Sequence, residues 1–178
     1  RVLIHYRKRP YAEKILLSGR GTADQPIRVC GVPGPGGELP MISGAHATTR
    51  RSHHYPYAGT QDRGLVVVSL QQGGRWGYKP GYIEIQGLAI AHAYRGDGAP
   101  QTFTGQDGDT RTWSENAAAI FVERGEHIVV RGCEIFDSGN GFFVASQGSE
   151  EVLSRDVVFD GNYVHDCGMT KSYLDHDV

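Results

Sequence analysis

The sequence lacks the features that mark several common partner classes. Charge of neither sign is in excess, with 18 Lys and Arg residues against 20 Asp and Glu residues. No broad field is therefore available to gather phosphate backbones or anionic lipid. No stretch approaches the roughly 20 apolar residues of a membrane-spanning helix, and no charged-then-apolar signal segment opens the chain. We expect neither nucleic acid nor a membrane span among its partners.

Cysteine is also scarce. Cys30, Cys133 and Cys167 form no CxxC pair and have no regular spacing that would indicate a zinc site. Each lies in an expected strand or at a strand end, which favours small buried thiols. A disulfide between Cys133 and Cys167 is the alternative, so the cysteines do not decide the redox compartment.

Glycine, in contrast, is abundant at 25 residues, and it marks an internal repeat. Three segments align without gaps, and each reads strand, polar residue, glycine, strand. The repeated glycines are Gly87, Gly132 and Gly161. The three segments are Tyr82-Ile-Glu-Ile-Gln-Gly-Leu-Ala-Ile-Ala-His92, His127-Ile-Val-Val-Arg-Gly-Cys-Glu-Ile-Phe-Asp137 and Asp156-Val-Val-Phe-Asp-Gly-Asn-Tyr-Val-His-Asp166.

Two short strands separated by a polar residue and a glycine must turn sharply, and glycine accepts the left-handed conformation of such a corner. The apolar positions on both sides of each corner then face one interior. Those positions are Ile83, Ile85, Leu88 and Ile90, then Ile128, Val130, Cys133 and Ile135, then Val157, Phe159, Asn162 and Val164. The repeat therefore predicts an all-β fold, a right-handed parallel β-helix in which each strand pairs with its equivalent in the next coil.

A second strand precedes two of these units, at Ala119–Val122 and Gly141–Val144, and Ile120 and Phe142 are 22 residues apart. Leu65–Val68 is a similar strand before the first unit. Pro26–Val29 and Leu39–Ile42 supply an earlier, looser coil, which gives about four coils in all. We expect polar insertions between strands at about 71–81, 94–116 and 146–155, because loops directed into solvent cost little.

These coils would occupy 25–178, and residues 1–24 would form an N-terminal cap or strand region. The segment Arg1–Arg7 alternates like a strand already under way, and Lys171–Val178 is polar where another coil would start. We therefore expect the chain to be the N-terminal part of a longer β-helix that is truncated at its C-terminus.

The aligned pattern, together with Gly21-Thr-Ala-Asp-Gln-Pro-Ile-Arg-Val29 and Pro40-Met-Ile-Ser-Gly44, resembles pectate-lyase-like parallel β-helix proteins, nearest to secreted polysaccharide lyases. The resemblance covers about residues 15–168. It implies a groove along one sheet, where a cation neutralises a uronate carboxylate and a Lys, Arg or His base removes the adjacent proton. None of the family's catalytic motifs matches a position here, so the resemblance places the catalytic groups beyond Val178.

Several residues of this chain are candidates for substrate binding or catalysis independently of the resemblance. If Ile120 and Val122 face inward, then Phe121 and Glu123 face outward, and Phe143 does so in the next coil. Phe121 and Phe143 could form a platform for a sugar ring or be covered by a loop. Glu123 could be an acid, a cation ligand or a solvated carboxylate.

Carboxylates gather in the longest insertion, at Asp97, Asp107 and Asp109. Closely spaced carboxylates around glycine can supply the oxygen ligands of calcium, although the EF-hand spacing is missing. A loop tip without a metal is the alternative.

Histidines and aspartates end the three aligned units, at His92, Asp137 and His165-Asp166. They should lie near one another along one edge, either poised for proton transfer or serving as turn residues. A further polar cluster at 173–177 adds His176 as a catalytic candidate.

The sequence favours a carbohydrate-active β-helix protein that is secreted, periplasmic or on the cell surface. We expect it to be a lyase that cleaves an acidic, uronate-containing polysaccharide. A non-catalytic module that binds glycans or builds a surface is the alternative. A glycoside hydrolase would need two carboxylates about 5–10 Å apart on one face, and Glu123 has no evident partner.

Overall fold

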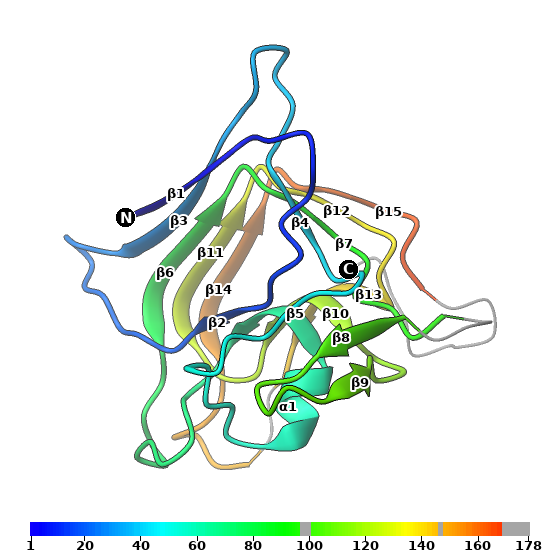
Figure 1. The fold of residues 1–178 in the computed structure, drawn as a ribbon. Coiled ribbons are helices and arrows are strands. Elements are labelled where there is room, and N and C mark those ends of the chain that lie inside the picture. Colours follow the sequence, from blue (N-terminus) through cyan, green and yellow to red (C-terminus); the bar gives the residue numbers. More distant parts are fainter. Residues whose placement is uncertain (97–100, 146–147, 169–178) are drawn as a thin grey trace.

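The computed structural model describes residues 1–96, 101–145 and 148–168, and nearly all of its regular structure is β-strand (Figure 1). Three parallel sheets form the body of the molecule, each named here after one strand. The β5 sheet holds β2 (Ile15–Leu17), β5 (Gly64–Val68), β10 (Ala118–Val122) and β13 (Asn140–Val144). The β6 sheet holds β1 (Val2–His5), β3 (Ile27–Val32), β6 (Gly81–Gln86), β11 (Glu126–Arg131) and β14 (Arg155–Asp160). The β7 sheet holds β4 (Met41–Ser43), β7 (Ala89–Ala91), β12 (Glu134–Phe136) and β15 (Tyr163–His165).

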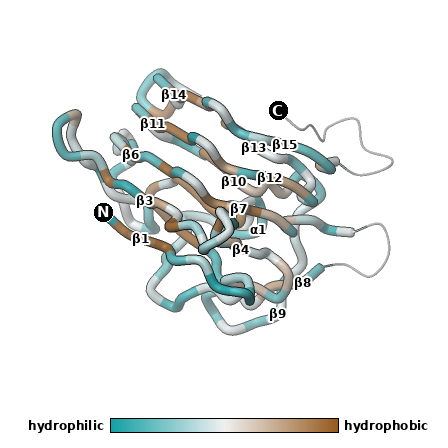
Figure 2. The backbone as a smooth tube through the Cα atoms, turned by 90° about the horizontal axis from the view of Figure 1, so that it is seen from above, coloured by the Kyte–Doolittle hydropathy of each residue, from teal (hydrophilic) through white to brown (hydrophobic). Residues whose placement is uncertain are grey.

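The chain passes through these sheets in one fixed order. It runs from the β5 sheet to the β6 sheet to the β7 sheet in β2–β4, again in β5–β7, then in β10–β12 and finally in β13–β15. We call each passage a round. Equivalent strands of successive rounds pair in parallel, and Figure 2 shows them lying side by side. The predicted all-β class and the parallel pairing are both confirmed.

The three aligned segments stack in the predicted register. Gln86 pairs with Arg131, which pairs with Asp160, so the glycine that follows each of them lies in one column. These three glycines have φ values of 61°, 57° and 61° for Gly87, Gly132 and Gly161. The left-handed corner inferred from the sequence is therefore present in three successive rounds.

Gly31 is a fourth glycine of this column, and a glycine is required at this position because there is no room for a side chain. A Cβ atom on Gly31 would lie 1.8 Å from the carbonyl oxygen of Gly87. The rounds therefore approach each other so closely at this corner that a side chain cannot fit.

The core lies between the three sheets, and the repeat's inward positions fill it. Ile83, Ile85, Leu88 and Ile90 are fully buried, as are Ile128, Val130 and Ile135 of the next round. The corresponding Val157, Phe159 and Val164 are partly buried and pack against the same cluster. Alternation along the strands thus directs one apolar face inward, as the sequence predicts.

Residues 1–24, the expected cap or strand region, contribute β1 and β2, which pair with β3 and β5. The insertion at 94–116 carries an antiparallel hairpin of β8 (Thr102–Thr104) and β9 (Thr110–Thr112). A further insertion at 44–63, which the repeat did not reveal, carries α1 (Ala58–Asp62). In the described part of the chain, no helix has the length and apolar character to cross a bilayer.

The insertions at 44–63 and 94–116 contact each other, because both connect the β7 sheet to the β5 sheet. The backbone N–H of Gln106 donates to the side chain of Gln61, and the side chain of Gln106 accepts from the N–H of Tyr55. Together they cover the outer face of the β5 sheet, where Tyr55 packs in a cluster with Val67 and Phe121.

Candidate functional site

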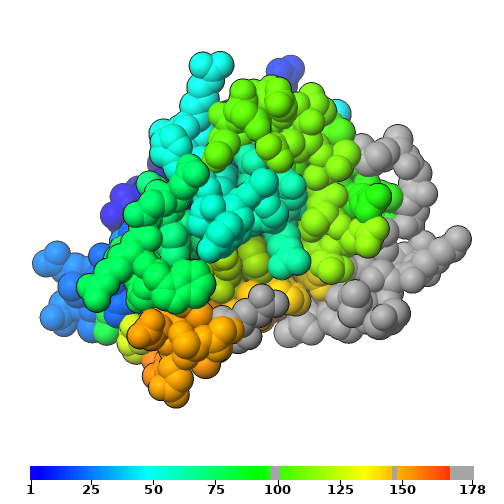
Figure 3. All heavy atoms as spheres, turned by 90° about the horizontal axis from the view of Figure 1, so that it is seen from below, coloured from blue at the N-terminus to red at the C-terminus, as the bar shows by residue number. Residues whose placement is uncertain are grey.

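The connections from the β5 sheet to the β6 sheet differ in length, and this difference shapes the surface. The middle connection, between β10 and β11, consists only of Glu123, Arg124 and Gly125. The connections before and after it, 69–80 and 145–154, are much longer. Figure 3 shows the two long connections, in green and orange, close together on one face of the molecule. Residues of both long connections line two neighbouring cavities, and Glu123 and Arg124 of the short connection line the second of these.

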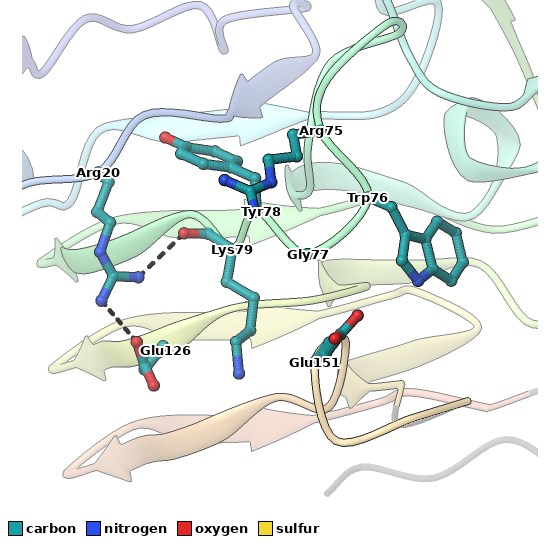
Figure 4. Close-up of a pocket in the computed structure, with 8 residues that line it drawn as sticks. All are labelled: Arg20, Arg75, Trp76, Gly77, Tyr78, Lys79, Glu126 and Glu151. Atoms are coloured by element: carbon teal, nitrogen blue, oxygen red, sulfur yellow. Dashed lines mark hydrogen bonds and ion pairs between the residues drawn. The ribbon is translucent and has the colours of Figure 1, made fainter.

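The first cavity has a volume of about 660 Å³. Arg20, Arg75, Trp76, Gly77, Tyr78, Lys79, Glu126 and Glu151 line it (Figure 4). Arg20 donates to Glu126 at 2.5 Å and to the carbonyl oxygen of Lys79 at 3.0 Å. The hydrogen bond from Arg20 lowers the pKa of the Glu126 carboxyl, so this group stays ionised.

The second cavity has a volume of about 380 Å³ and shares Trp76 with the first. It is lined by Tyr57, Gly59, Thr60, Arg63, Trp76, Phe121, Glu123, Arg124, Ala145 and Val152. The two cavities therefore meet at the indole ring of Trp76, and we call their combined surface the Trp76 groove.

Two kinds of side chain dominate the groove. Its cations are Arg20, Arg63, Arg75, Lys79 and Arg124, and its carboxylates are Glu123, Glu126 and Glu151. Its exposed aromatic rings are Trp76 and Tyr57, both 54% exposed, and Tyr78 at 37%. Excess positive charge beside exposed rings suits an anionic ligand with an apolar face.

Among the sequence candidates, Glu123 lies in the groove, where it accepts a hydrogen bond from the Ser69 hydroxyl. The sequence left open whether Phe121 and Phe143 form an exposed platform or are covered by a loop, and the two rings differ in this respect. The two rings are 5.9 Å apart, but Phe121 is only 2% exposed because Tyr55 and its neighbours cover it, whereas Phe143 is 38% exposed. Phe121 contributes to the wall of the cavity and not to an open platform.

His165 and Asp166 lie away from the groove, at the end of β15. Their side chains are 2.8 Å apart, and the second ring nitrogen of His165 is 3.4 Å from Glu134. The hydrogen bond to Asp166 raises the pKa of His165. His92 and Asp137 lie along the same edge as predicted, with their side chains 3.4 Å apart, and His176 falls outside the described residues.

Of the three candidate calcium ligands, Asp107 and Asp109 lie in the described part of the chain. Asp107 is held by Arg111 at 2.6 Å and accepts the backbone N–H of Asp109 at the tip of the β8–β9 hairpin. Asp97 lies outside the described residues. Across the described ranges, no group of three or more His, Cys, Asp or Glu side chains could hold a metal ion.

The cysteine alternatives are resolved as well. Cys30 and Cys133 are free, buried thiols. Burial raises the pKa of the Cys133 thiol, which makes it a poor nucleophile. The alternative disulfide between Cys133 and Cys167 is wrong.

Most groove residues were not found from the sequence. Arg75, Trp76, Tyr78 and Lys79 all fall in the insertion at 71–81, which we expected only as a solvent loop. The signal was present, because a run that alternates basic and aromatic residues is unusual for a plain turn. Arg20 and Arg124 gave no such signal, since only the fold brings them to this surface.

Comparison of the chain with protein-family models, with curated proteins and with solved structures gave no match. Its function must therefore be inferred from the geometry of the groove.

Proposed function

We propose that this chain is a carbohydrate-active protein of the pectate-lyase-like type, whose rounds are coils of a right-handed parallel β-helix. We propose further that the Trp76 groove binds an acidic polysaccharide. A location outside the cytoplasm, where such polymers occur, belongs to the same proposal.

The exposed Trp76 ring between two cation-lined cavities carries the proposal. A pyranose ring has an apolar face that stacks on an indole. A uronate carboxylate needs a cationic partner, and arginine offers paired donors of matching geometry. Sugar units on either side of Trp76 would reach Arg20, Arg75 and Lys79 in one cavity, and Arg63 in the other.

The acidic groups of the groove favour binding of the polysaccharide over its cleavage, because two of them are already engaged by neighbouring side chains. Glu126 is ion-paired with Arg20, Glu123 is bonded to Ser69, and no histidine is among the described residues that line either cavity. A non-catalytic glycan-binding module thus fits these groups best.

A lyase is the second candidate, and the cations favour it. Neutralising a uronate carboxylate makes the proton on the adjacent carbon more acidic, so the bound state is also the first step of β-elimination. A base must then take that proton, and Lys79 is the lysine among the described residues that line the groove. Its side chain extends toward Glu126 and Glu151 in Figure 4, and its amine donates to the carbonyl oxygen of Leu153 at 3.3 Å.

The test is affinity electrophoresis of the whole chain in gels containing polygalacturonate, alginate or the neutral glucan pullulan. We expect retardation by the acidic polymers only, weakened by added salt because the contacts are ionic. Trp76→Ala should lose most of the retardation. Tyr163→Ala, which removes a 64% exposed ring far from the groove, should keep it.

Equal retardation by pullulan, or an unaffected Trp76→Ala variant, would refute the proposed ligand and site. Incubation with the same polymers, followed by the ultraviolet absorbance of unsaturated uronate ends, separates the two candidates. Product formation supports the lyase, and retardation without product supports the binding module.

A further inference from the structure

A serine, a histidine and an aspartate from three successive rounds lie in one row, joined by a hydrogen bond between Ser43 and His92 and an ion-pair contact between His92 and Asp137. Ser43 ends β4, His92 follows β7 and Asp137 follows β12. The Ser43 Oγ atom lies 2.7 Å from His92 Nδ1, and His92 Nε2 lies 3.4 Å from Asp137 Oδ2. The stacking of the β7 sheet brings them together, because Ser43, Ala91 and Phe136 are register partners.

One tautomer of His92 gives this row a direction for proton transfer. Ser43 Oγ accepts the backbone N–H of Ala45 at 3.2 Å, and its own proton can be donated to His92 Nδ1 when that ring nitrogen carries no proton. In that tautomer the ring proton is on Nε2, which lies 3.4 Å from Asp137 Oδ2. This is the arrangement in which a histidine takes a proton from a serine and an aspartate stabilises the imidazolium that results.

The backbone holds the histidine and the aspartate in unusual conformations. His92 has a φ of 66° and Asp137 a φ of 43°, both in the left-handed region that residues other than glycine rarely adopt. The ring of Phe136 packs edge-on to His92, with centroids 6.1 Å apart. The His92 side chain is 27% exposed and that of Asp137 is 49% exposed, while Ser43 is 5% exposed.

We infer that Ser43, His92 and Asp137 form a nucleophilic site that hydrolyses esters of small acyl groups. The small exposure of Ser43 limits the acyl group to the size of acetyl. The site lies between the β7 and β5 sheets, whereas the Trp76 groove lies between the β5 and β6 sheets. The inference is therefore independent of the proposed glycan binding.

The reaction balances without any added reactant except water. Ser43 Oγ attacks the ester carbonyl carbon and gives its proton to His92 Nδ1. The bond from that carbon to the alkoxy oxygen breaks, and the alcohol leaves with the proton from His92. Water, deprotonated by His92, then attacks the acyl-serine, releasing the carboxylic acid and restoring Ser43.

The test uses the whole chain with p-nitrophenyl acetate as substrate and a fluorophosphonate as trapping reagent. We expect hydrolysis above the buffer rate, and mass spectrometry of digested, labelled protein should place the phosphonyl group on Ser43. Ser43→Ala should reduce the rate at least about 100-fold and abolish labelling. His92→Asn and Asp137→Asn, chosen because asparagine tolerates left-handed backbone, should also slow hydrolysis.

Ser52→Ala is the matched control, because Ser52 is an exposed loop serine, and it should retain the full rate. Circular dichroism of each variant checks that the strands are intact. Labelling of another serine, or a folded Ser43→Ala variant with the original rate, would overturn the assignment. Absence of both hydrolysis and labelling in the original chain would overturn it as well.

Discussion

Arg124 holds Trp76 by two separate contacts. Its Nη1 donates to the backbone carbonyl oxygen of Trp76 at 2.9 Å, and its Cζ lies 4.9 Å from the centroid of the Trp76 ring. Because Arg124 is only 5% exposed, a buried guanidinium from the short β10–β11 connection fixes the long 69–80 connection of the preceding round. The shape of the Trp76 groove thus depends on this pair.

Replacing Arg124 by alanine should therefore destabilise the protein as well as the groove. We expect the free energy of unfolding to fall by about 1–3 kcal/mol, through loss of a charge-assisted hydrogen bond and a cation–π contact. Urea denaturation followed by circular dichroism measures it. Arg75→Ala removes an exposed arginine of the same groove and should change stability by less than about 0.5 kcal/mol. Equal stabilities of the two variants would show that Arg124 does not hold the loop.

Lys14 should make stability depend on pH in the alkaline range. Its amine donates to the carbonyl oxygen of Gly64 and lies 4.0 Å from the Trp113 ring centroid, fully buried. Burial lowers the pKa of Lys14 well below its ordinary value of 10.5, despite the opposing charge of Asp62.

Between the lowered pKa of Lys14 in the folded protein and its ordinary pKa in the unfolded chain, the unfolded chain binds a proton that the folded protein does not bind. The contribution of Lys14 to the free energy of unfolding therefore rises as the pH rises between these two values, by up to about 1.4 kcal/mol per pH unit. Urea titrations of the original chain and of Lys14→Met between pH 7 and 9.5 should show a difference in unfolding free energy that grows with pH. A constant difference would mean that Lys14 stays charged in the fold.

Two glycines of the corner column should respond differently to alanine. Gly132→Ala meets no atom within 4 Å, so only the left-handed backbone at φ 57° opposes it, at about 1–2 kcal/mol. Gly31→Ala drives a methyl group into the Gly87 carbonyl and should cost more than about 3 kcal/mol or prevent folding. Thermal unfolding of both variants, with the yield of folded protein as a second readout, checks that Gly31→Ala is the more destabilising change. The prediction fails if Gly31→Ala is the more stable.

On the outer face of the β5 sheet, the burial of Phe121 predicts that its replacement by alanine costs more stability than the same replacement of Phe143. Phe121→Ala should lower the free energy of unfolding by about 3–5 kcal/mol, as expected for a buried phenylalanine. Phe143→Ala should lower it much less, because that ring is already 38% exposed. Guanidinium denaturation of the two variants compares them, and similar losses would indicate that the 44–63 insertion does not cover Phe121 in solution.

The strand framework could be predicted from the sequence because its signals are local. Each aligned segment carries its own alternation and its own glycine, so Gly87, Gly132 and Gly161 define the register without any knowledge of distant contacts. The insertion at 44–63 was missed because it repeats nothing, so the sequence did not show which segment covers Phe121. The groove was missed for the same reason, apart from the basic and aromatic run at 75–79.

The sequence by itself thus determined which residues face the core, since side-chain direction alternates along a strand and repeats from round to round. Only the tertiary structure decided which surface groups meet. Ser43 and His92 are 49 residues apart, and Arg20 lies 106 residues from Glu126. Contacts across such separations depend on the lengths and paths of the connections between strands, which no local pattern records.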